Sequence, residues 1–342
     1  MEQRKRVEYI DVAKGIAIWL VVIGHTISSQ YKGVMLNRWI YSFHMPLFFI
    51  LSGYFFKERA FKITLKKAVC GLLVPYFIIN GIKCVVGALW GWSPSTILDK
   101  YILPMLYGNG APKYGDMVIF PVKAIGMTWF LLALFWCHIL YYYMYRFSRE
   151  LNISTWIPVI AVFLFGIELT KKVWLPWSVQ AGMGALLFYQ IGVWMKKKDI
   201  FEKDWGNDRL GIYICAAVLW LLSVRYESIG MHANSYKGVG VIIGAAVGTY
   251  FTVQFSKYLL KVPYIGEFFR WCGNHSIIIY GFHALDAFLL TRIEACIMRI
   301  FVLPGVLGTI LYCLIRISLI LLGSFLVLRI KSCLESRYRS AC

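Results

Sequence analysis

Apolar residues along the chain gather in runs of about the length that crosses a membrane. About 20 apolar residues in a helix span the ~30 Å hydrocarbon layer, and runs near this length recur from one end of the sequence to the other. We predict ten such spans, at 10–29, 39–56, 68–90, 127–145, 154–170, 178–195, 209–224, 238–255, 273–291 and 306–328. The polar separators are short except for 91–126, which is the one sizeable loop and a candidate lid. The pattern predicts an all-α, polytopic membrane helix bundle that forms a single domain over residues 1–342.

Lys and Arg are distributed unevenly over the separators. With the N-terminus inside, the inner separators hold 22 of these residues and the outer ones 11, while Lys14, Lys83 and Arg316 fall within spans. The side richer in Lys and Arg tends to stay cytoplasmic. Both termini are therefore predicted to be cytoplasmic.

The composition excludes a soluble domain, and the distribution of the positive charge argues against a nucleic-acid-binding protein. Hydrophobic residues make up 59% and charged residues 15% of the chain, against about 45–50% and about 25% in soluble domains. The net charge is +19, but the cations lie in short clusters between apolar runs, which is not the footprint of a nucleic-acid-binding protein. The nine Cys residues show no CxxC or Cys/His metal spacing, so no metal site is expected.

The first span carries three ionisable residues, Asp11, Lys14 and His25. Each such group costs about 2.5–3.5 kcal/mol near the membrane centre and usually faces a cavity or a partner. Lys14 and His25 are eleven residues apart, which places both on one helix stripe about 16.5 Å apart along the axis. Asp11 can pair with Lys14 but lies too far from His25 to orient its ring. The alternative is that Lys14 snorkels to the interface and His25 bonds a neighbouring helix.

The second span contains FHMPLFFILSGYFF, from Phe43 to Phe56. Because this span runs inward, His44 is expected at a depth similar to that of His25. Pro46 either opens the second helix or kinks it. Ser52 and Gly53 lie further in and offer a small surface, for which simple helix packing is an equally good explanation.

Other polar residues within the spans occur singly. For most of them packing or pairing is expected, although His283 and Asp286 are three residues apart and could share a helix face. The set comprises His138, Glu168, Gln180, Gln190, His283, Asp286 and Arg316.

Several of these segments together resemble the acyltransferase-3 family of bacterial membrane O-acyltransferases, particularly its fucose 4-O-acetylase-like and intercellular-adhesin-type branch. The family carries a basic residue, ten intervening residues and a His in the first helix, and FxxSG in the second. These positions fall on Lys14, His25, Ser52 and Gly53. Weaker matches follow in order along nearly the whole chain: LLVPY (72–76), TWFLLAL (128–134) and GNHSIIIYGFH (273–283).

The resemblance implies transfer of an acyl group, most often acetyl from cytoplasmic acetyl-CoA, to a hydroxyl of a cell-envelope polysaccharide or lipid-linked glycan. It implies a location in the bacterial inner membrane, with acyl-CoA, the glycan and the lipid bilayer as partners, and leaves room for a homo-oligomer. His25 would be the general base or a transient acyl carrier, and His44 would support it. The remaining roles are cofactor binding for Lys14, Lys66, Lys67 and Ser52, acceptor binding for Trp129 and His283, and pairing with Lys14 for Asp11.

The sequence departs from the family pattern in the stretch after the second span, and one alternative function remains. In the family an RxxR stretch often follows the second helix, whereas Lys66 and Lys67 are followed here by Cys70 or Gly71 at the second basic position. The rival function is a transporter or flippase of a glycan or lipid-linked precursor, because the same polar groups would line a pathway. The sequence shows no inverted repeat that would favour it.

Overall fold

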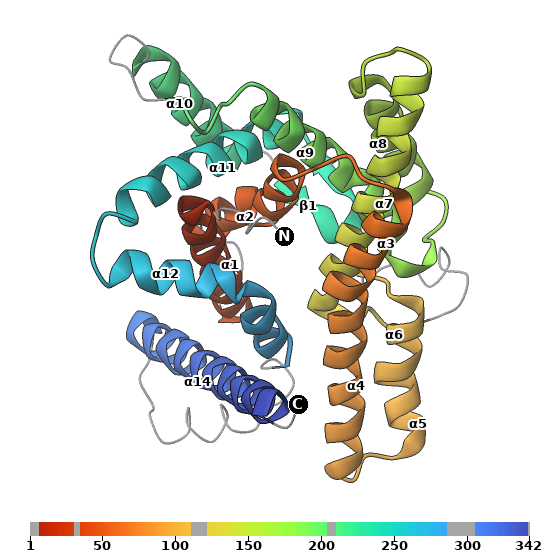
Figure 1. Cartoon of the computed structure of the whole chain (residues 1–342), viewed down its shortest axis with the longest axis vertical. Coiled ribbons are helices and arrows are strands. Elements are labelled where there is room, and N and C mark those ends of the chain that lie inside the picture. Colours follow the sequence, from red (N-terminus) through yellow and green to blue (C-terminus); the bar gives the residue numbers. More distant parts are fainter. Residues whose placement is uncertain are drawn as a thin grey trace.

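The computed structural model describes residues 7–30, 35–110, 122–203, 210–226, 228–285 and 305–340. Within these ranges the fold is helical apart from one short β-ribbon (Figure 1), so the predicted all-α class is confirmed. The main helices are α1 (Glu8–Gln30), α2 (Met35–Tyr54), α3 (Phe61–Ala68), α4 (Val74–Leu89), α5 (Pro94–Ile97), α6 (Leu103–Tyr107), α7 (Trp129–Glu150), α8 (Trp156–Thr170), α9 (Val179–Lys197), α10 (Leu210–Tyr226), α11 (Gly240–Leu259), α12 (Ile265–Asn274) and α14 (Gly305–Ser340). The ribbon pairs β1 (Ser228–Gly230) antiparallel with β2 (Ser235–Lys237).

Helices α1 and α2 lie at the centre of the bundle (Figure 1). Helix α1 packs mainly on α12, and α2 packs on α9 and α11, while α7 and α8 cover the other side of α9. The two helices that carry Lys14, His25 and His44 are therefore enclosed by others, which places their polar side chains inside the protein.

Within the described ranges, four helices are long and apolar enough to cross a membrane, and the chain is accordingly a multi-pass membrane protein. They comprise Glu8–Ile27, Phe61–Leu89, Gly126–Glu150 and Ile310–Ile330, and three shorter apolar helices comprise Trp156–Thr170, Leu210–Arg225 and Ser276–Leu285. Large apolar side chains on α4, α10 and α14 are exposed, for example Val85, Ile212 and Leu322. An exposed apolar surface of this extent marks a face that contacts lipid.

The predicted spans 39–56, 178–195 and 238–255 correspond to α2, α9 and α11, which are not among those seven helices. Helices α2, α9 and α11 pack on one another, and α2 and α11 also pack on α1. Helices that contact other helices carry small and polar residues at their interfaces, as Gly53 of α2 and Gly192 of α9 do where these two helices cross. Ten membrane crossings therefore remain a prediction.

The structure corrects the sequence-based boundaries in three places. The expected loop 91–126 begins as a helical hairpin, because α5, a π-helical turn and α6 run back beside α4 (Figure 1). The separator before span 273–291 holds α12, an amphipathic helix whose charged residues hid it from a hydropathy reading. That span itself is broken at His275, and its residues 286–291 lie outside the described ranges.

A π-helical segment joins α3 and α4, which otherwise form one continuous helix. Residues Val69–Leu73 are π-helical and are followed by Pro75. A proline within a helix clashes with the carbonyl four residues earlier, here that of Gly71, and a π-helical turn offers room for the displaced carbonyl. The turn also widens the helix where it faces the large cavity described below.

Glycines bring α2 and α9 into direct backbone contact. A Cβ added at Gly53 would lie 1.9 Å from the Tyr189 carbonyl oxygen, and one added at Gly192 would lie 1.9 Å from the Ile50 carbonyl oxygen. Both distances are far below van der Waals contact. Only glycine fits at this crossing, and the small residue predicted at position 53 serves helix packing.

We expect Gly53→Ala to lower the melting temperature of the purified protein in detergent. The added methyl group must push α2 away from α9, and overpacking of this kind costs about 1–3 kcal/mol. Gly81→Ala in α4 is the matched control, because a Cβ there meets no atom within 4 Å. Equal melting temperatures for the two variants would contradict this account of the crossing.

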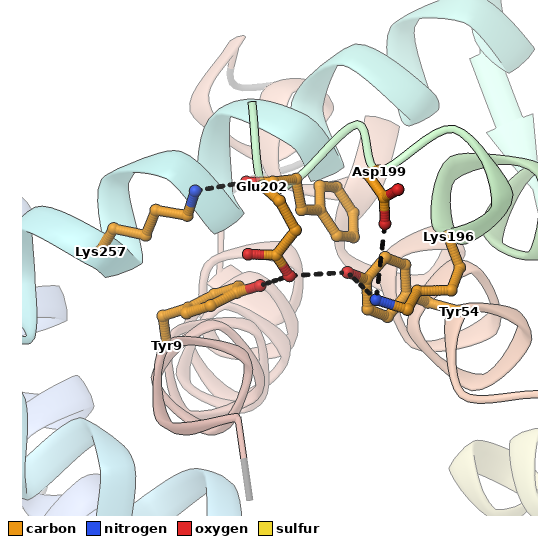
Figure 2. Close-up of polar contacts among 7 residues, drawn as sticks. Tyr9, Tyr54, Lys196, Asp199, Glu202 and Lys257 are labelled. Atoms are coloured by element: carbon orange, nitrogen blue, oxygen red, sulfur yellow. Dashed lines mark hydrogen bonds and ion pairs between the residues drawn. The ribbon is translucent and has the colours of Figure 1, made fainter. Parts of the chain in front are cut away.

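A polar cluster ties four segments together at one end of the bundle (Figure 2). The Tyr9 hydroxyl donates to Glu202 Oε1 at 2.6 Å, and the Tyr54 hydroxyl donates to the same oxygen at 3.2 Å. Lys196 Nζ donates to the Tyr54 hydroxyl at 3.4 Å, and Lys257 Nζ donates to the carbonyl oxygen of Phe201. The hydrogen bond from Tyr9 is the main cause that lowers the pKa of Glu202. The cluster fixes the start of α1 against the ends of α2 and α9.

Candidate active site

One stripe of α1 connects two cavities. Lys14, Ile18, Val21 and His25 follow one another at spacings of four, three and four residues, so they share one face of the helix. The first three line a large cavity, and Val21 and His25 line a small one. The stripe predicted from the spacing of Lys14 and His25 is therefore the wall of two adjoining chambers.

The large cavity has a volume of about 440 Å³ and a basic mouth. Its cationic lining residues are Lys14, Lys57, Arg59 and Lys67. Its walls are apolar and aromatic, with contributions from Phe48, Phe55, Phe56, Leu72, Phe130 and Leu134. A cavity of this kind suits an elongated ligand with an anionic head and a less polar tail.

Lys14 lies in this cavity as one half of an ion pair. Its Nζ is 3.3 Å from Asp11 Oδ1 and 5.5 Å from the centre of the Phe55 ring. Asp11 is only 8% exposed, so its carboxylate depends on this cation. The pair leaves Lys14 partly accessible to a ligand in the cavity.

The other predicted cofactor contacts divide between the cavity and the surface. Ser52 lines the cavity, with its hydroxyl donating to the Phe48 carbonyl at 2.7 Å. Lys67 also lines it, whereas Lys66 is exposed and is not among its lining residues. Gly71 lines the cavity too, so the position that would carry the second basic residue offers open space instead of charge.

The small cavity, of about 90 Å³, gathers the histidines. It is lined by His25 from α1, Tyr41 and His44 from α2, Trp129 from α7 and His232 from the turn of the β-ribbon. Together with Tyr280, segments far apart in the sequence thus bring three imidazoles, two phenols and an indole to one chamber. His44 lies well inside α2, which continues through Pro46, so the proline does not open the helix.

The rings of His25 and His44 are each held by a hydrogen bond at Nδ1. His25 Nδ1 lies 3.2 Å from the Tyr41 hydroxyl, and His44 Nδ1 lies 2.8 Å from the Ile40 carbonyl oxygen. A carbonyl only accepts, so His44 carries its proton on Nδ1 and has a free lone pair on Nε2. Where the Tyr41 hydroxyl accepts from His25 Nδ1–H, His25 Nε2 also keeps its lone pair. Tyr41, and not His44, is the residue bonded to the His25 ring.

Two further buried groups lie against His25. The His283 ring centre is 5.4 Å from that of His25, and Arg316 of α14 donates to the Thr26 hydroxyl at 3.0 Å. Arg316 is 5% exposed and lies close enough to His25 for electrostatic interaction. His283 is not among the residues that line the small cavity, and its expected partner Asp286 lies outside the described residues.

Trp129 and His232 form the opposite wall of the small cavity. Their ring centres are 6.2 Å apart. Burial lowers the pKa of His232, because a buried environment disfavours the charged imidazolium. This part of the lining combines an apolar indole with an imidazole for which burial favours the neutral form.

Four side chains that were not predicted as site residues lie at the two cavities or beside them; Tyr41 and His232 were not singled out in the sequence, and His138 and Arg316 were expected to serve packing or pairing. Tyr41 lies three residues before His44, so helical spacing would have found it. His138 lines the large cavity, with its Nδ1 3.2 Å from the Tyr189 hydroxyl. Arg316 and His232 reach the site through contacts across the fold, for which no local pattern exists. Among the described residues, no group of three His, Cys, Asp or Glu side chains is arranged to hold a metal ion.

A comparison with protein families identifies the chain. The acyltransferase domain of the acyltransferase-3 family matches residues 7–329, which contain every candidate site residue named above. The chain belongs to this family and is an acyltransferase. The family resemblance inferred from the five sequence segments is thereby confirmed.

A curated protein also matches part of this acyltransferase. Nodulation protein NolL of Mesorhizobium japonicum (strain LMG 29417 / CECT 9101 / MAFF 303099) is 30% identical over 158 residues, which cover 43% of this acyltransferase. The match covers 37% of the length of NolL. No solved structure matches the acyltransferase.

Proposed function

We propose that this acyltransferase moves an acetyl group from acetyl-CoA to a hydroxyl of a cell-envelope polysaccharide or lipid-linked glycan at the bacterial inner membrane. The observation that carries the proposal is the α1 stripe, which joins a basic cavity to a histidine cavity through a single helix face. The two cavities correspond to the two substrates. An anionic acyl donor fits the first, and a neutral hydroxyl fits the second.

The large cavity is assigned to acyl-CoA. Phosphate groups pair with Lys and Arg, and the mouth offers Lys14, Lys57, Arg59 and Lys67. The narrower arm that ends in the thioester would follow the apolar walls toward Val21. Ser52 and His138 supply polar contacts along this route, and Lys66 is left out of the assignment because it does not line the cavity.

In the direct route, His25 Nε2 acts as the general base. It takes the proton of the acceptor hydroxyl while that oxygen attacks the thioester carbonyl carbon. The carbon–sulfur bond then breaks, and the CoA thiolate leaves with the proton returned from the imidazolium. Arg316 places a cation beside His25, where it would stabilise the negative charge that develops on the carbonyl oxygen.

In the second route, His25 Nε2 attacks the thioester carbonyl itself. The carbon–sulfur bond breaks, and the CoA thiolate gains the Nδ1 proton through Tyr41, which leaves a neutral acyl-imidazole. The acceptor hydroxyl then attacks this carbonyl, the carbon–nitrogen bond breaks and the hydroxyl proton returns to the imidazole. Rapid quenching with radiolabelled acetyl-CoA distinguishes the routes, because only the second leaves label on the protein.

The acceptor side is assigned to His44 and Trp129, both of which line the small cavity. The free Nε2 of His44 can accept a hydrogen bond from a sugar hydroxyl, and Trp129 provides an apolar wall. His283 is assigned to hold the His25 ring instead of the acceptor, because it packs on His25.

Release of CoA from acetyl-CoA tests the function. Purified protein in nanodiscs, supplied with a cell-envelope glycan extract, is expected to release CoA thiol and to transfer labelled acetyl to the glycan in equal amounts. The transporter alternative predicts glycan movement across proteoliposomes without either product. Glycan movement with no thiol release would exclude the proposed reaction.

Both termini are proposed to be cytoplasmic, with the basic cavity mouth on the same side. In a cysteine-free variant, Ser95→Cys in α5 is expected to react with an impermeant maleimide added to intact cells. Lys198→Cys, just after α9, is expected to react only after permeabilisation. Both parent side chains are exposed. The reverse labelling pattern would place Lys14 on the outer side and remove the cytoplasmic donor from the proposal.

A further inference from the structure

Three residues line both cavities: Val21, Met45 and Tyr280. They come from α1, α2 and the helix Ser276–Leu285, so they form the partition between the two chambers. We propose that this partition, together with the small chamber behind it, selects short acyl groups, with Met45 as its adjustable member. The inference rests on the proposed function, because it assigns the acyl donor to the large cavity.

The three partition residues differ in their freedom to move. The Tyr280 hydroxyl donates to the Met127 carbonyl oxygen, and its ring centre lies 5.9 Å from that of Phe130. Val21 is buried and β-branched, which leaves its side chain few rotamers. Met45 is unbranched, with three rotatable bonds and a polarisable thioether. Displacement of Met45 is therefore the easiest way to open a passage between the chambers.

The position of His25 decides where the acyl group must lie. Reacting atoms need to approach to about 3–3.5 Å, and His25 lines only the small cavity. The thioester carbon must therefore reach the partition, with the CoA sulfur on the large side. The carbon–sulfur bond then breaks at the partition, the thiol leaves through the large cavity, and the acyl group remains on the side of His25.

The volume of the small cavity limits what can occupy it. Its volume of 90 Å³ is smaller than the volume of about 150 Å³ of an engineered apolar cavity that binds benzene. The acyl group and the acceptor hydroxyl must both fit within that space. A two-carbon group leaves room for the hydroxyl, and a four-carbon group fills the chamber.

A series of acyl-CoA donors tests this inference with the purified full-length protein. Acetyl-, butyryl- and hexanoyl-CoA are supplied with the glycan extract, and CoA release and acyl transfer are measured. Each methylene that a pocket must reject changes kcat/KM by about 10- to 200-fold. The native protein is expected to use butyryl-CoA at least about tenfold less well than acetyl-CoA. Met45→Ala should raise the butyryl-to-acetyl ratio of kcat/KM by about tenfold.

Two further variants make the test specific. Val21→Ala removes less volume and should raise the same ratio by a smaller factor, and it decides the question where Met45→Ala does not fold. Leu72→Ala is the matched control, because Leu72 lines only the large cavity, and it should leave the ratio unchanged.

The outcomes separate the inference from the function on which it rests. Absence of CoA release from every donor, in the native protein and in all variants, would overturn the proposed function. Acetyl transfer by the native protein together with an unchanged ratio in folded Met45→Ala and Val21→Ala would overturn only the partition. Equal use of acetyl- and hexanoyl-CoA by the native protein would also overturn it.

Discussion

Replacing His25 with Ala is expected to lower kcat for acyl transfer by about 10²–10⁴-fold, the range typical of a lost general base. The KM for acyl-CoA should stay near its native value, because His25 lines the small cavity and not the large one. A group that acts only in the transition state changes kcat, whereas a group that binds equally in both states changes KM. Steady-state CoA release at varied acetyl-CoA concentrations measures both constants.

His275→Ala is the matched control for this experiment. Its ring bonds the Trp271 carbonyl at 2.9 Å, and it lines neither cavity. A folded His25→Ala variant with native kcat would remove His25 from the chemical step. His44 and His283 would then be the next residues to test.

Replacing Lys14 with Ala is expected to raise the KM for acyl-CoA by about 10-fold or more with little change in kcat. A hydrogen bond to a charged group contributes about 1.5–3 kcal/mol, and Lys14 is a cation in the lining of the large cavity. Lys14→Arg should be tolerated better because it keeps the charge. Lys62→Ala serves as the control, since Lys62 is exposed and outside that lining.

The ion pair of Lys14 requires one additional variant. Without Lys14, the buried Asp11 carboxylate loses the cation that lies 3.3 Å away, and an unpaired buried charge destabilises the fold. The double variant Lys14→Ala with Asp11→Asn removes both charges. A restored melting temperature with a KM that stays high would assign the effect to acyl-CoA. A KM that returns to normal would assign it to the carboxylate.

The sequence predicted the α1 stripe because helical periodicity is local. Two polar residues eleven positions apart in an apolar helix must share a face, and the structure places Lys14 and His25 on one face. The same periodicity explains why Lys66 and Lys67 differ. Neighbouring residues point about 100° apart on a helix, so only one of two consecutive lysines faces the large cavity, and the sequence does not reveal which.

Other parts of the site depend on contacts that no local pattern encodes. His232 reaches Trp129 through a β-ribbon turn, and Arg316 reaches Thr26 from a helix 290 residues further along the chain. Helix α12 was missed because its charged face lowers its hydropathy, although it is the main packing partner of α1. Hydropathy finds helices that contact lipid, and it is a weaker guide to helices that contact protein.

The composition of the α1 stripe also bears on electrical insulation. A continuous polar passage through a membrane protein would dissipate a voltage or a proton gradient across the membrane. Between Lys14 and His25 the stripe carries only Ile18 and Val21, and a stable internal water needs two to four polar partners. These two side chains offer no polar partner to a chain of water molecules along the α1 stripe. The cation and the imidazole on this helix face are thus separated by an apolar stretch of the stripe.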